Sequence, residues 1–557
     1  MKKIIYSVAL FALAILISSC GKNPDAIFIN GKIHTLDDDN NVVEALAVRN
    51  GMIMDIGTTK DITSKYHVSN VIDLQNKVVI PGFIDCDGSI VEFSKSLMYT
   101  AYLNNKKSIA DIQNVITDKI KYLKENDWLV LYNLNIEPFS DKDVDDFDKK
   151  VIDKIANNFN IVIIDSLRTF TLVNSKVIET LQLKKPAPGF EDENIQIDDK
   201  GEFTGLFFDS AQKLIFEKIP EFSTIQIYNA VERGSQELLK YGITEVQDRT
   251  VTKDAINIFK DLIDSNKLSV KIYGVLTGED VSFDEFQQKG IIENYKDKLT
   301  VRAVCLDYDG ALEIQDASMK SGYLNEPKDN QPYIDSVKIE EVFNKALDKN
   351  FQFRIKVIGD KGVNTVLNSI SRIVKTRNPK DIRTVIEYAE FISPQDIQRF
   401  KELNIIPSIR PETTVDDIGI LPDIITPDNL KNIGVWKSLI QSGGKIITGS
   451  GFPFENQINP FIQIYYLTQR KQIDGSDKDI PNSEQKVNLL DALKSYTIWA
   501  CYSGFEDNIK GNLMIGKAAD MIILSDDIFN STPDVLLKVK VDKTIINGIV
   551  MYDIVKN

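Results

Sequence analysis

Residues suited to metal-assisted chemistry are scarce in this chain. Its 557 residues include only two histidines, His34 and His67. Neutral imidazoles are common ligands of the catalytic ions that turn bound water into hydroxide. The segment Asp85-Cys86-Asp87-Gly88-Ser89 follows an apolar run and offers two carboxylates and a hydroxyl, but both histidines lie well upstream of it. We expect both histidines to be non-catalytic, and the chain offers no histidine-rich metal site.

The cysteines do not supply an alternative nucleophile. Apart from Cys20 near the start, they are Cys86, Cys305 and Cys501, an odd number that is widely spaced. No disulfide framework is implied. A catalytic thiol needs a neighbouring base for activation, and the chain has no histidine to spare for this role. We therefore expect Cys86 and Cys305 to be small buried hydrophobic residues.

The composition limits the kinds of molecule that this chain is expected to bind. A formal charge of -15 disfavours nucleic acid, because phosphate binding needs basic patches. An acidic surface more often keeps a protein soluble. The chain is long enough for a large barrel and a satellite domain. The sequence leaves open whether the chain forms a homo-oligomer.

The first residues read as a targeting segment. Lys2 and Lys3 precede an apolar core over residues 4–17, which is too short to span a bilayer comfortably. The sequence Ile17-Ser18-Ser19-Cys20 then resembles a bacterial lipobox, with Cys20 as the lipid attachment point. We expect a lipoprotein signal peptide over residues 1–19 and a linker over 20–25. An Asp after the lipidated cysteine retains many bacterial lipoproteins in the inner membrane, but here Gly21 follows Cys20. We therefore expect Cys20 to anchor the chain in the bacterial cell envelope, in the outer membrane rather than the inner one.

Both ends of the mature chain predict short strands and tight turns. Asn30-Gly31, Asn50-Gly51 and Asn547-Gly548 lie between apolar alternating runs, which is a strong hairpin signal. Residues 26–80 and 506–557 are therefore expected to form one small β-sandwich together.

The middle of the chain alternates strand-like and helix-like segments, the pattern of a parallel α/β fold. Eight apolar, β-branched segments favour a TIM (β/α)8 barrel over residues 81–505. The interval after the first of them, about 91–240, is too long for one connection, and we expect an insertion over the barrel mouth. The eight segments are Val78–Asp85, Ile243–Gln247, Val270–Leu276, Thr300–Leu306, Phe353–Ile358, Arg383–Tyr388, Ile405–Ile409 and Lys445–Thr448.

A series of motifs in this order resembles the amidohydrolase family, in particular the branch of N-substituted formamide deformylases. The resemblance covers nearly the whole mature chain and implies an ancestry among hydrolases of non-peptide C–N bonds. The motifs that carry it are Pro81-Gly82-Phe83-Ile84-Asp85, Val173-Asn174-Ser175, Gly205-Leu206-Phe207, Tyr241-Gly242-Ile243-Thr244, Ile358-Gly359-Asp360, Ile386-Glu387-Tyr388-Ala389, Gly449-Ser450-Gly451-Phe452-Pro453 and Gly516-Lys517-Ala518-Ala519-Asp520.

The same resemblance implies that the metal site has been lost, so we expect neither metal nor cofactor. Asp87 and Ser89 stand where the family has two metal-binding histidines. Lys356 and Tyr388 replace two more, and Gly451 replaces the aspartate that binds metal and serves as base. Two further positions are matched less securely: Cys305 falls where a carboxylated lysine bridges two metals, and Thr169 where a histidine faces the substrate.

These replacements have chemical consequences. A serine hydroxyl is a poor ligand for a transition metal, a lysine ammonium repels a divalent ion, and glycine cannot move a proton. Asp87 and Lys356 should both project into the barrel mouth, and we expect them to form an ion pair within about 4 Å. Asp309 and Asp360 are expected to brace loops.

Three functions remain open. The first is a lipid-anchored protein of the amidohydrolase fold that has lost metal-dependent hydrolysis and binds a small molecule or a partner at the old mouth. The second is an active hydrolase of non-peptide C–N bonds with metal-independent chemistry around Lys356, assisted by Asp87 or Tyr388. The third is a degenerate subunit that acts with an active homologue. Family resemblance alone does not decide among them.

Overall fold

A computed structural model describes residues 23–104, 106–183, 194–249, 251–279, 281–312, 314–324, 331–417, 421–455, 457–473 and 482–556. The predicted signal peptide and Cys20 lie outside these residues. Across the described ranges, no helix has the length and apolar character needed to cross a bilayer.

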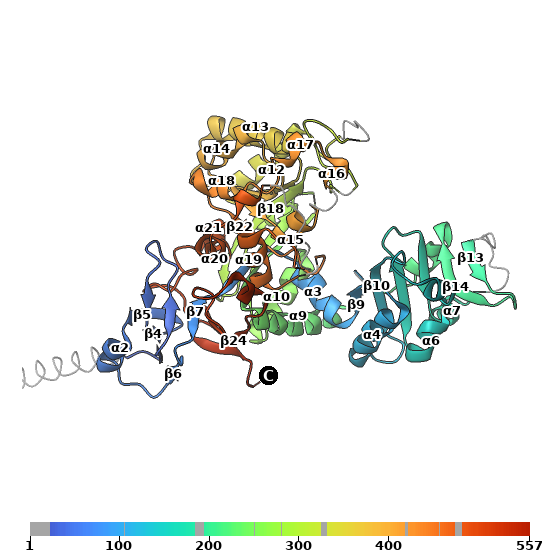
Figure 1. Ribbon diagram of the computed structural model, residues 1–557, viewed down its shortest axis with the longest axis horizontal. Coiled ribbons are helices and arrows are strands. Elements are labelled where there is room, and N and C mark those ends of the chain that lie inside the picture. Colours follow the sequence, from blue (N-terminus) through green and yellow to red (C-terminus); the bar gives the residue numbers. More distant parts are fainter. Residues whose placement is uncertain are drawn as a thin grey trace, which may run out of the picture.

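A parallel barrel occupies the centre of the molecule (Figure 1). Each of the eight predicted segments overlaps a barrel strand, and the TIM-barrel prediction is confirmed. The first segment, Val78–Asp85, also covers β7 (Val78–Pro81), which belongs to the β-sandwich. In spatial order the neighbours are β22-β21-β20-β19-β18-β16-β15-β8. Their bounds are β8 (Phe83–Gly88), β15 (Ile243–Arg249), β16 (Lys271–Thr277), β18 (Leu299–Asp307), β19 (Gln352–Val357), β20 (Val385–Tyr388), β21 (Ile406–Ile409) and β22 (Ile447–Thr448), with β17 (Ile292–Tyr295) paired antiparallel to β18.

The segment that follows β22 closes the barrel against β8. The Gly451 amide donates to the Asp87 carbonyl at 2.7 Å, and the Ser89 amide donates to the Phe452 carbonyl at 3.0 Å. Because the eight barrel strands are parallel, their carboxyl ends and these closing contacts lie at one end of the barrel. In barrels of this kind that end carries the functional site.

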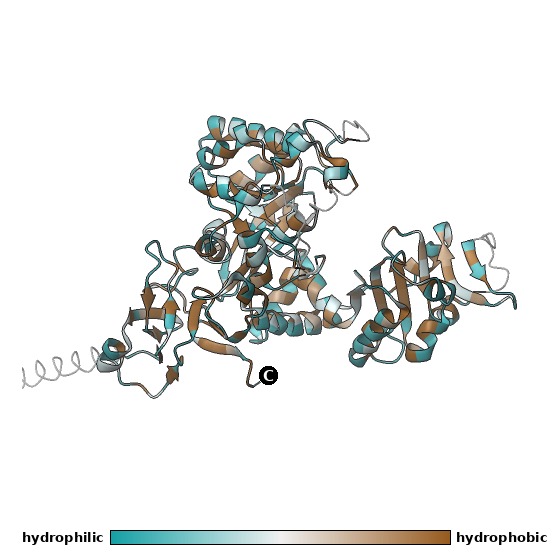
Figure 2. Ribbon diagram, viewed as in Figure 1, coloured by the Kyte–Doolittle hydropathy of each residue, from teal (hydrophilic) through white to brown (hydrophobic). Residues whose placement is uncertain are grey.

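Helices cover the outside of the barrel and bury apolar side chains against its strands (Figure 2). The strands combine apolar residues with buried charged ones such as Glu245, Arg354 and Glu387. In α10, Ala255, Phe259 and Leu262 recur at helical spacing and are buried, while Thr252 caps the first turn by accepting from the Ala255 amide. The helices are α10 (Lys253–Asp264), α11 (Val281–Lys289), α12 (Ser336–Asp348), α13 (Asp360–Arg377), α14 (Pro394–Glu402), α15 (Pro411–Asp417), α16 (Leu421–Ile424), α17 (Pro427–Leu430), α18 (Trp436–Gln441), α19 (Pro460–Gln469), α20 (Leu489–Ser495) and α21 (Ile498–Ser503).

The two ends of the chain share one small β-sandwich, as predicted. One sheet has the order β5-β4-β1-β6, and the other, β25-β24-β23-β7-β2-β3, interleaves strands from both ends. Phe28 and Val48 of the first sheet share a core with Val79 and Met521 of the second. The elements are β1 (Ala26–Ile29), β2 (Lys32–His34), β3 (Val42–Val43), β4 (Ala45–Arg49), β5 (Met52–Gly57), α2 (Thr59–Lys65), β6 (Val71–Asp73), β7 (Val78–Pro81), β23 (Met521–Leu524), β24 (Val541–Ile546) and β25 (Ile549–Asp553).

The predicted insertion is present as a six-stranded sheet with helices on its faces, but it is set to one side of the barrel and not over its mouth (Figure 1). The chain enters it through α3 (Ile90–Met98) and returns through α9 (Thr224–Leu238). These two helices pack tightly, since a Cβ on Gly234 would overlap the Ser94 hydroxyl. The insertion contains β9 (Thr100–Tyr102), α4 (Ile109–Lys119), β10 (Trp128–Leu134), α5 (Asp141–Asp145), α6 (Lys150–Ala156), β11 (Asn160–Asp165), β12 (Phe170–Val173), α7 (Ser175–Leu181), β13 (Ile195–Ile197), β14 (Phe203–Phe208) and α8 (Gln212–Phe216).

Candidate functional site

Charged side chains of alternating sign surround the mouth of the barrel. Six of the eight strands place one at or just beyond the carboxyl end, and neighbouring strands that carry charges carry opposite ones. Around the barrel these residues are Asp87 of β8, Arg249 of β15, Asp307 of β18, Lys356 of β19, Glu387 of β20 and Arg410 directly after β21.

A buried ion pair joins the first and last strands of this series. Arg410 Nε donates to Asp87 Oδ2 at 2.6 Å, with side chains only 10% and 6% exposed. Burial alone would raise the pKa of Asp87, but the charge and hydrogen bond of Arg410 hold that pKa below its usual range. The guanidinium also reaches Glu455 Oε1 at 3.1 Å through Nη1, and its carbon lies 4.1 Å from the centre of the Tyr388 ring.

Arg410 occupies the space next to Gly451. A Cβ built on Gly451 would lie 2.9 Å from the guanidinium carbon of Arg410 and 2.6 Å from Cγ of Glu455. Gly451 also has a φ of +74°, a conformation that side chains other than glycine rarely adopt. The chain therefore has no room for an aspartate side chain here while Arg410 is in place.

The predicted ion pair between Asp87 and Lys356 is wrong. Asp87 is paired with Arg410 instead, because the guanidinium arrives from β21, which is closer around the barrel to β8 than β19 is. The Lys356 ammonium lies over the Tyr388 ring, 4.8 Å from its centre. Burial, followed by the opposing effects of Asp307 and of Arg249 and Arg410, leaves the pKa of Lys356 below its ordinary value.

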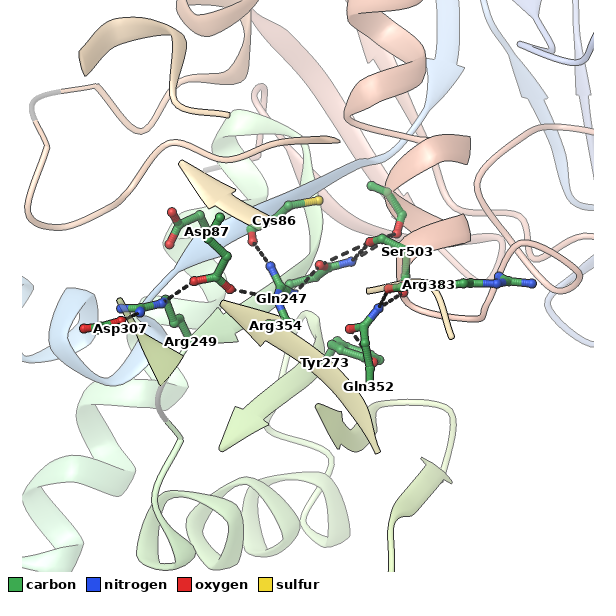
Figure 3. Close-up of polar contacts among 12 residues, drawn as sticks. Cys86, Asp87, Gln247, Arg249, Tyr273, Asp307, Gln352, Arg354, Arg383 and Ser503 are labelled. Carbon is green, nitrogen blue, oxygen red and sulfur yellow. Dashed lines mark hydrogen bonds and ion pairs between the residues drawn. The ribbon is translucent and has the colours of Figure 1, made fainter. Parts of the chain in front are cut away.

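A second network fills the barrel beneath this mouth (Figure 3). Arg354, 1% exposed, donates to Glu387 at 2.7 Å, to the Gln247 side chain at 2.9 Å and to the Cys86 carbonyl at 3.2 Å. Arg249 binds the other oxygen of Glu387 and also binds Asp307. The buried charges are therefore paired, which is what makes their burial tolerable.

The remaining predicted positions are more distant from this chemistry. Ser89 is the N-cap residue of α3 but makes no capping bond through its side chain, and Asp248 accepts from the Ile90 amide at 3.1 Å in its place. Cys305 packs inside the barrel, where burial raises its pKa to about 12, so the thiol stays protonated. Thr169 lies in the insertion and donates to Asp165 at 3.0 Å.

Several sequence predictions of structural roles are confirmed. Cys86 is buried like Cys305. Asp309 accepts from the backbone amides of residues 318, 358 and 359, and Asp360 accepts from the Lys320 amide and the Ser393 hydroxyl. Ser393 precedes α14 but makes no capping bond through its side chain, because its hydroxyl donates to Asp360. His34 stacks on Phe529 in the β-sandwich, with ring centres 3.6 Å apart.

A cavity of about 310 Å³ lies beside the mouth, where the insertion meets the barrel. Phe93 and Tyr102 form part of one side, and Phe452 and Glu455 form part of the other. Glu455 is also the partner of Arg410, so the wall of this cavity is connected directly to the buried ion pair. Lys119, whose pKa burial lowers to about 8, lines it as well.

The sequence profile of the Amidohydrolase family matches residues 70–552. The chain belongs to the amidohydrolase family. It is 24% identical to the YtcJ protein of Bacillus subtilis over 538 residues, covering 95% of this chain and 99% of that one. It is 19% identical over 545 residues to an N-substituted formamide deformylase of Arthrobacter pascens, covering 95% and 98%. A metal-dependent hydrolase of Pyrococcus horikoshii has the same fold, with a TM-score of 0.72 and 21% identity over 91% of this chain and 99% of that one.

The residues at the mouth do not fit the metal centre of an amidohydrolase. Among the described residues, no group of three or more His, Cys, Asp or Glu side chains could hold a metal ion. Asp87 is the single carboxylate at the matched positions, and it is already bound by a guanidinium. Cations at Arg249, Lys356 and Arg410 would also repel an incoming divalent ion.

Three arginines that organise this member of the amidohydrolase family, Arg249, Arg354 and Arg410, are absent from the residues predicted to form the site. A signal for them is present in the sequence: Arg354 lies inside the predicted strand segment Phe353–Ile358, and Arg249 and Arg410 lie within two residues of the ends of two others. Such a residue requires a buried partner.

Proposed function

We propose that this chain is an amidohydrolase-fold protein that has lost metal-dependent hydrolysis and binds a small molecule at the barrel mouth. One observation carries the proposal: the Arg410 guanidinium lies between Asp87 and Gly451, two positions at which the resemblance implies a metal ligand. A guanidinium cannot be deprotonated in a protein and has no acceptor to offer a metal.

The surroundings support a binding role. Two of the three cations at the mouth, Arg249 and Arg410, are held by ion pairs, and these pairs brace the strand ends as metal ligation would. The cavity of about 310 Å³ next to Glu455 has the size and the mixed apolar and charged lining of a small-molecule pocket. A ligand there would contact the loop that carries Glu455 and so would be sensed by Arg410.

Elemental analysis of the purified mature protein tests the loss of the metal. We expect no stoichiometric zinc, manganese or iron after growth with each metal supplied, and no metal-stimulated hydrolysis of N-substituted formamides. Asp87→Ala serves as the matched variant, because it removes the last carboxylate at the former ligand positions. About one or two metals per chain that disappear in Asp87→Ala would overturn the proposal.

A second candidate is hydrolysis of non-peptide C–N bonds by metal-independent chemistry around Lys356. The lowered pKa of Lys356 and its half-buried position favour it, since a neutral amine can act as base or form an imine. Borohydride trapping with carbonyl compounds, compared with Lys356→Arg, tests this. A covalent adduct at Lys356 would favour this candidate over the binding role.

We further propose that Cys20 is lipidated and anchors the protein in the bacterial cell envelope, in the outer membrane. The lipobox-like sequence before Cys20 supports this. Labelling of the expressed full-length chain with a palmitate analogue should mark the wild type and leave Cys20→Ala unlabelled in the soluble fraction. Equal labelling of both proteins would show that the anchor is elsewhere or absent.

A further inference from the structure

Lys356 differs from the other charged residues of the mouth. Its ammonium has no carboxylate within ion-pair distance and no hydrogen bond among the described residues, and its contact is the face of Tyr388. A ring face attracts a cation but accepts none of its N–H groups in the way an oxygen does. The ammonium is nevertheless half-buried at the position matched to a metal ligand.

The nearby carboxylates are already bound by arginines. Asp87 is held by Arg410. Glu387 gives one oxygen to Arg354 and the other to Arg249. Asp307, the partner of Lys356 in the strand ladder, gives Oδ1 to Arg249. The nearest carboxylates are therefore bound by arginines, and among the described residues Lys356 is the cation of the mouth that makes no ion pair.

We propose that Lys356 forms an anion subsite and that the small molecule bound at the mouth carries a carboxylate. This inference rests on the binding role proposed above and names the chemical class of its ligand. A carboxylate would accept from the Lys356 ammonium on the side away from the Tyr388 ring. One unpaired ammonium neutralises one negative charge, which favours a monoanion over a doubly charged phosphate.

The chemistry of the neighbours agrees with this assignment. Arg249 and Arg410 lower the pKa of Lys356 by repulsion, whereas Asp307 and Asp309 raise it. An anion beside the Lys356 ammonium is therefore attracted by three cations and repelled by two carboxylates, of which Asp307 is already bound by Arg249.

The Lys356 ammonium and the Arg410 guanidinium both lie over the Tyr388 ring, 4.8 Å and 4.1 Å from its centre. Arg410 is held by Asp87 and Glu455, whereas Lys356 makes no ion pair among the described residues.

The test uses protein labelled with ¹³C at lysine Cε, with the Lys356 signal assigned by its absence in Lys356→Met. The probes are benzoate, its neutral analogue benzamide, acetate and inorganic phosphate. We expect benzoate and acetate to shift the Lys356 signal and to raise the Lys356 pKa. Benzoate affinity should fall at least tenfold in Lys356→Met and be largely kept in Lys356→Arg. Lys375→Met, which removes an exposed lysine of α13, should behave as the wild type.

The outcomes separate this inference from the binding role. No response of Lys356 to any of the three anions would overturn the anion subsite. Tighter binding of phosphate than of benzoate would overturn the carboxylate assignment. Binding of benzamide that is unaffected by Lys356→Met, without binding of benzoate, would also overturn the subsite while leaving a binding role at the mouth. Metal-dependent hydrolysis in the elemental-analysis experiment would instead remove the proposed function itself.

Discussion

Replacing Arg410 by methionine should destabilise the barrel strongly. The side chains of Arg410 and Asp87 are 10% and 6% exposed and lie 2.6 Å apart. Methionine keeps much of the apolar volume but leaves the Asp87 carboxylate buried without its main partner. Breaking a buried pair in this way costs roughly 3–5 kcal/mol. We expect a value of about 3 kcal/mol, at the lower end, because Arg249 and Arg354 still attract Asp87.

The assay is urea unfolding followed by tryptophan fluorescence. The chain has three tryptophans. Trp436 and Trp499 lie in barrel helices and Trp128 lies in the insertion, so a Trp128→Phe background isolates the barrel transition. The matched control is Arg372→Met, because the pair of Arg372 with Glu340 is 54% and 34% exposed. Exposed pairs contribute about 0–1 kcal/mol.

A double-mutant cycle and a pH series complete the test. Asp87→Asn/Arg410→Met should be less destabilised than the sum of the single variants, by about 2 kcal/mol. Because the pKa of Asp87 is lowered in the fold, its contribution is present above the unfolded value of about 3.9 and is lost as the pH falls through the folded value. The stability difference between wild type and Asp87→Asn should shrink in that acid range. An additive cycle, or a cost for Arg410→Met no larger than for Arg372→Met, would refute the reasoning.

Three further predictions follow from other positions. Gly451→Asp should bind no metal and should lower the melting temperature more than Gly201→Asp does. Gly201 has a similar positive φ (+72° against +74°), but a Cβ added there would have no neighbour within 4 Å. Equal losses of melting temperature in the two variants would contradict crowding by Arg410. Gly234→Ala should lower the melting temperature although alanine favours helices by about 1 kcal/mol, and Ser94→Gly should rescue it, since the two residues meet where α3 packs on α9. Burial and the neighbouring Glu506 raise the pKa of Glu245 to about 8. In urea unfolding at a series of pH values, the wild type should therefore lose stability relative to Glu245→Gln as the pH rises from about 4.5 to about 8. A difference in unfolding free energy between the two proteins that does not change with pH would show that Glu245 does not titrate in this range.

The architecture could be predicted from the sequence because strands and turns are signalled within short stretches of the chain. Runs such as Val270–Leu276 and Ile405–Ile409 are apolar and β-branched, and a strand buried on both faces needs little else. Turn pairs such as Asn547-Gly548 locate hairpins for equally local reasons. The β-sandwich shared by both termini followed from these signals and from the order of the family-like motifs.

The site was predicted only in part, because side-chain pairing across a barrel depends on three-dimensional placement. The sequence identified Asp87, Lys356, Tyr388 and Gly451 as mouth positions through their flanking motifs. It could not show that Arg410, 323 residues from Asp87, would take the carboxylate that had been assigned to Lys356. The residue that pairs with Asp87 is decided by the order of the strands around the barrel and by the space that Gly451 leaves for the Arg410 guanidinium.

The guanidinium lodged beside Gly451 also restricts how this sequence can evolve. A histidine at position 87 would remove the shorter of the two ion pairs of Arg410, and an aspartate at position 451 would collide with Arg410. Loss of Arg410 first would strand Asp87 in the interior. Each of these single substitutions therefore begins with a less stable protein. Positions 87, 410 and 451 are constrained to change together, because each holds the others in place.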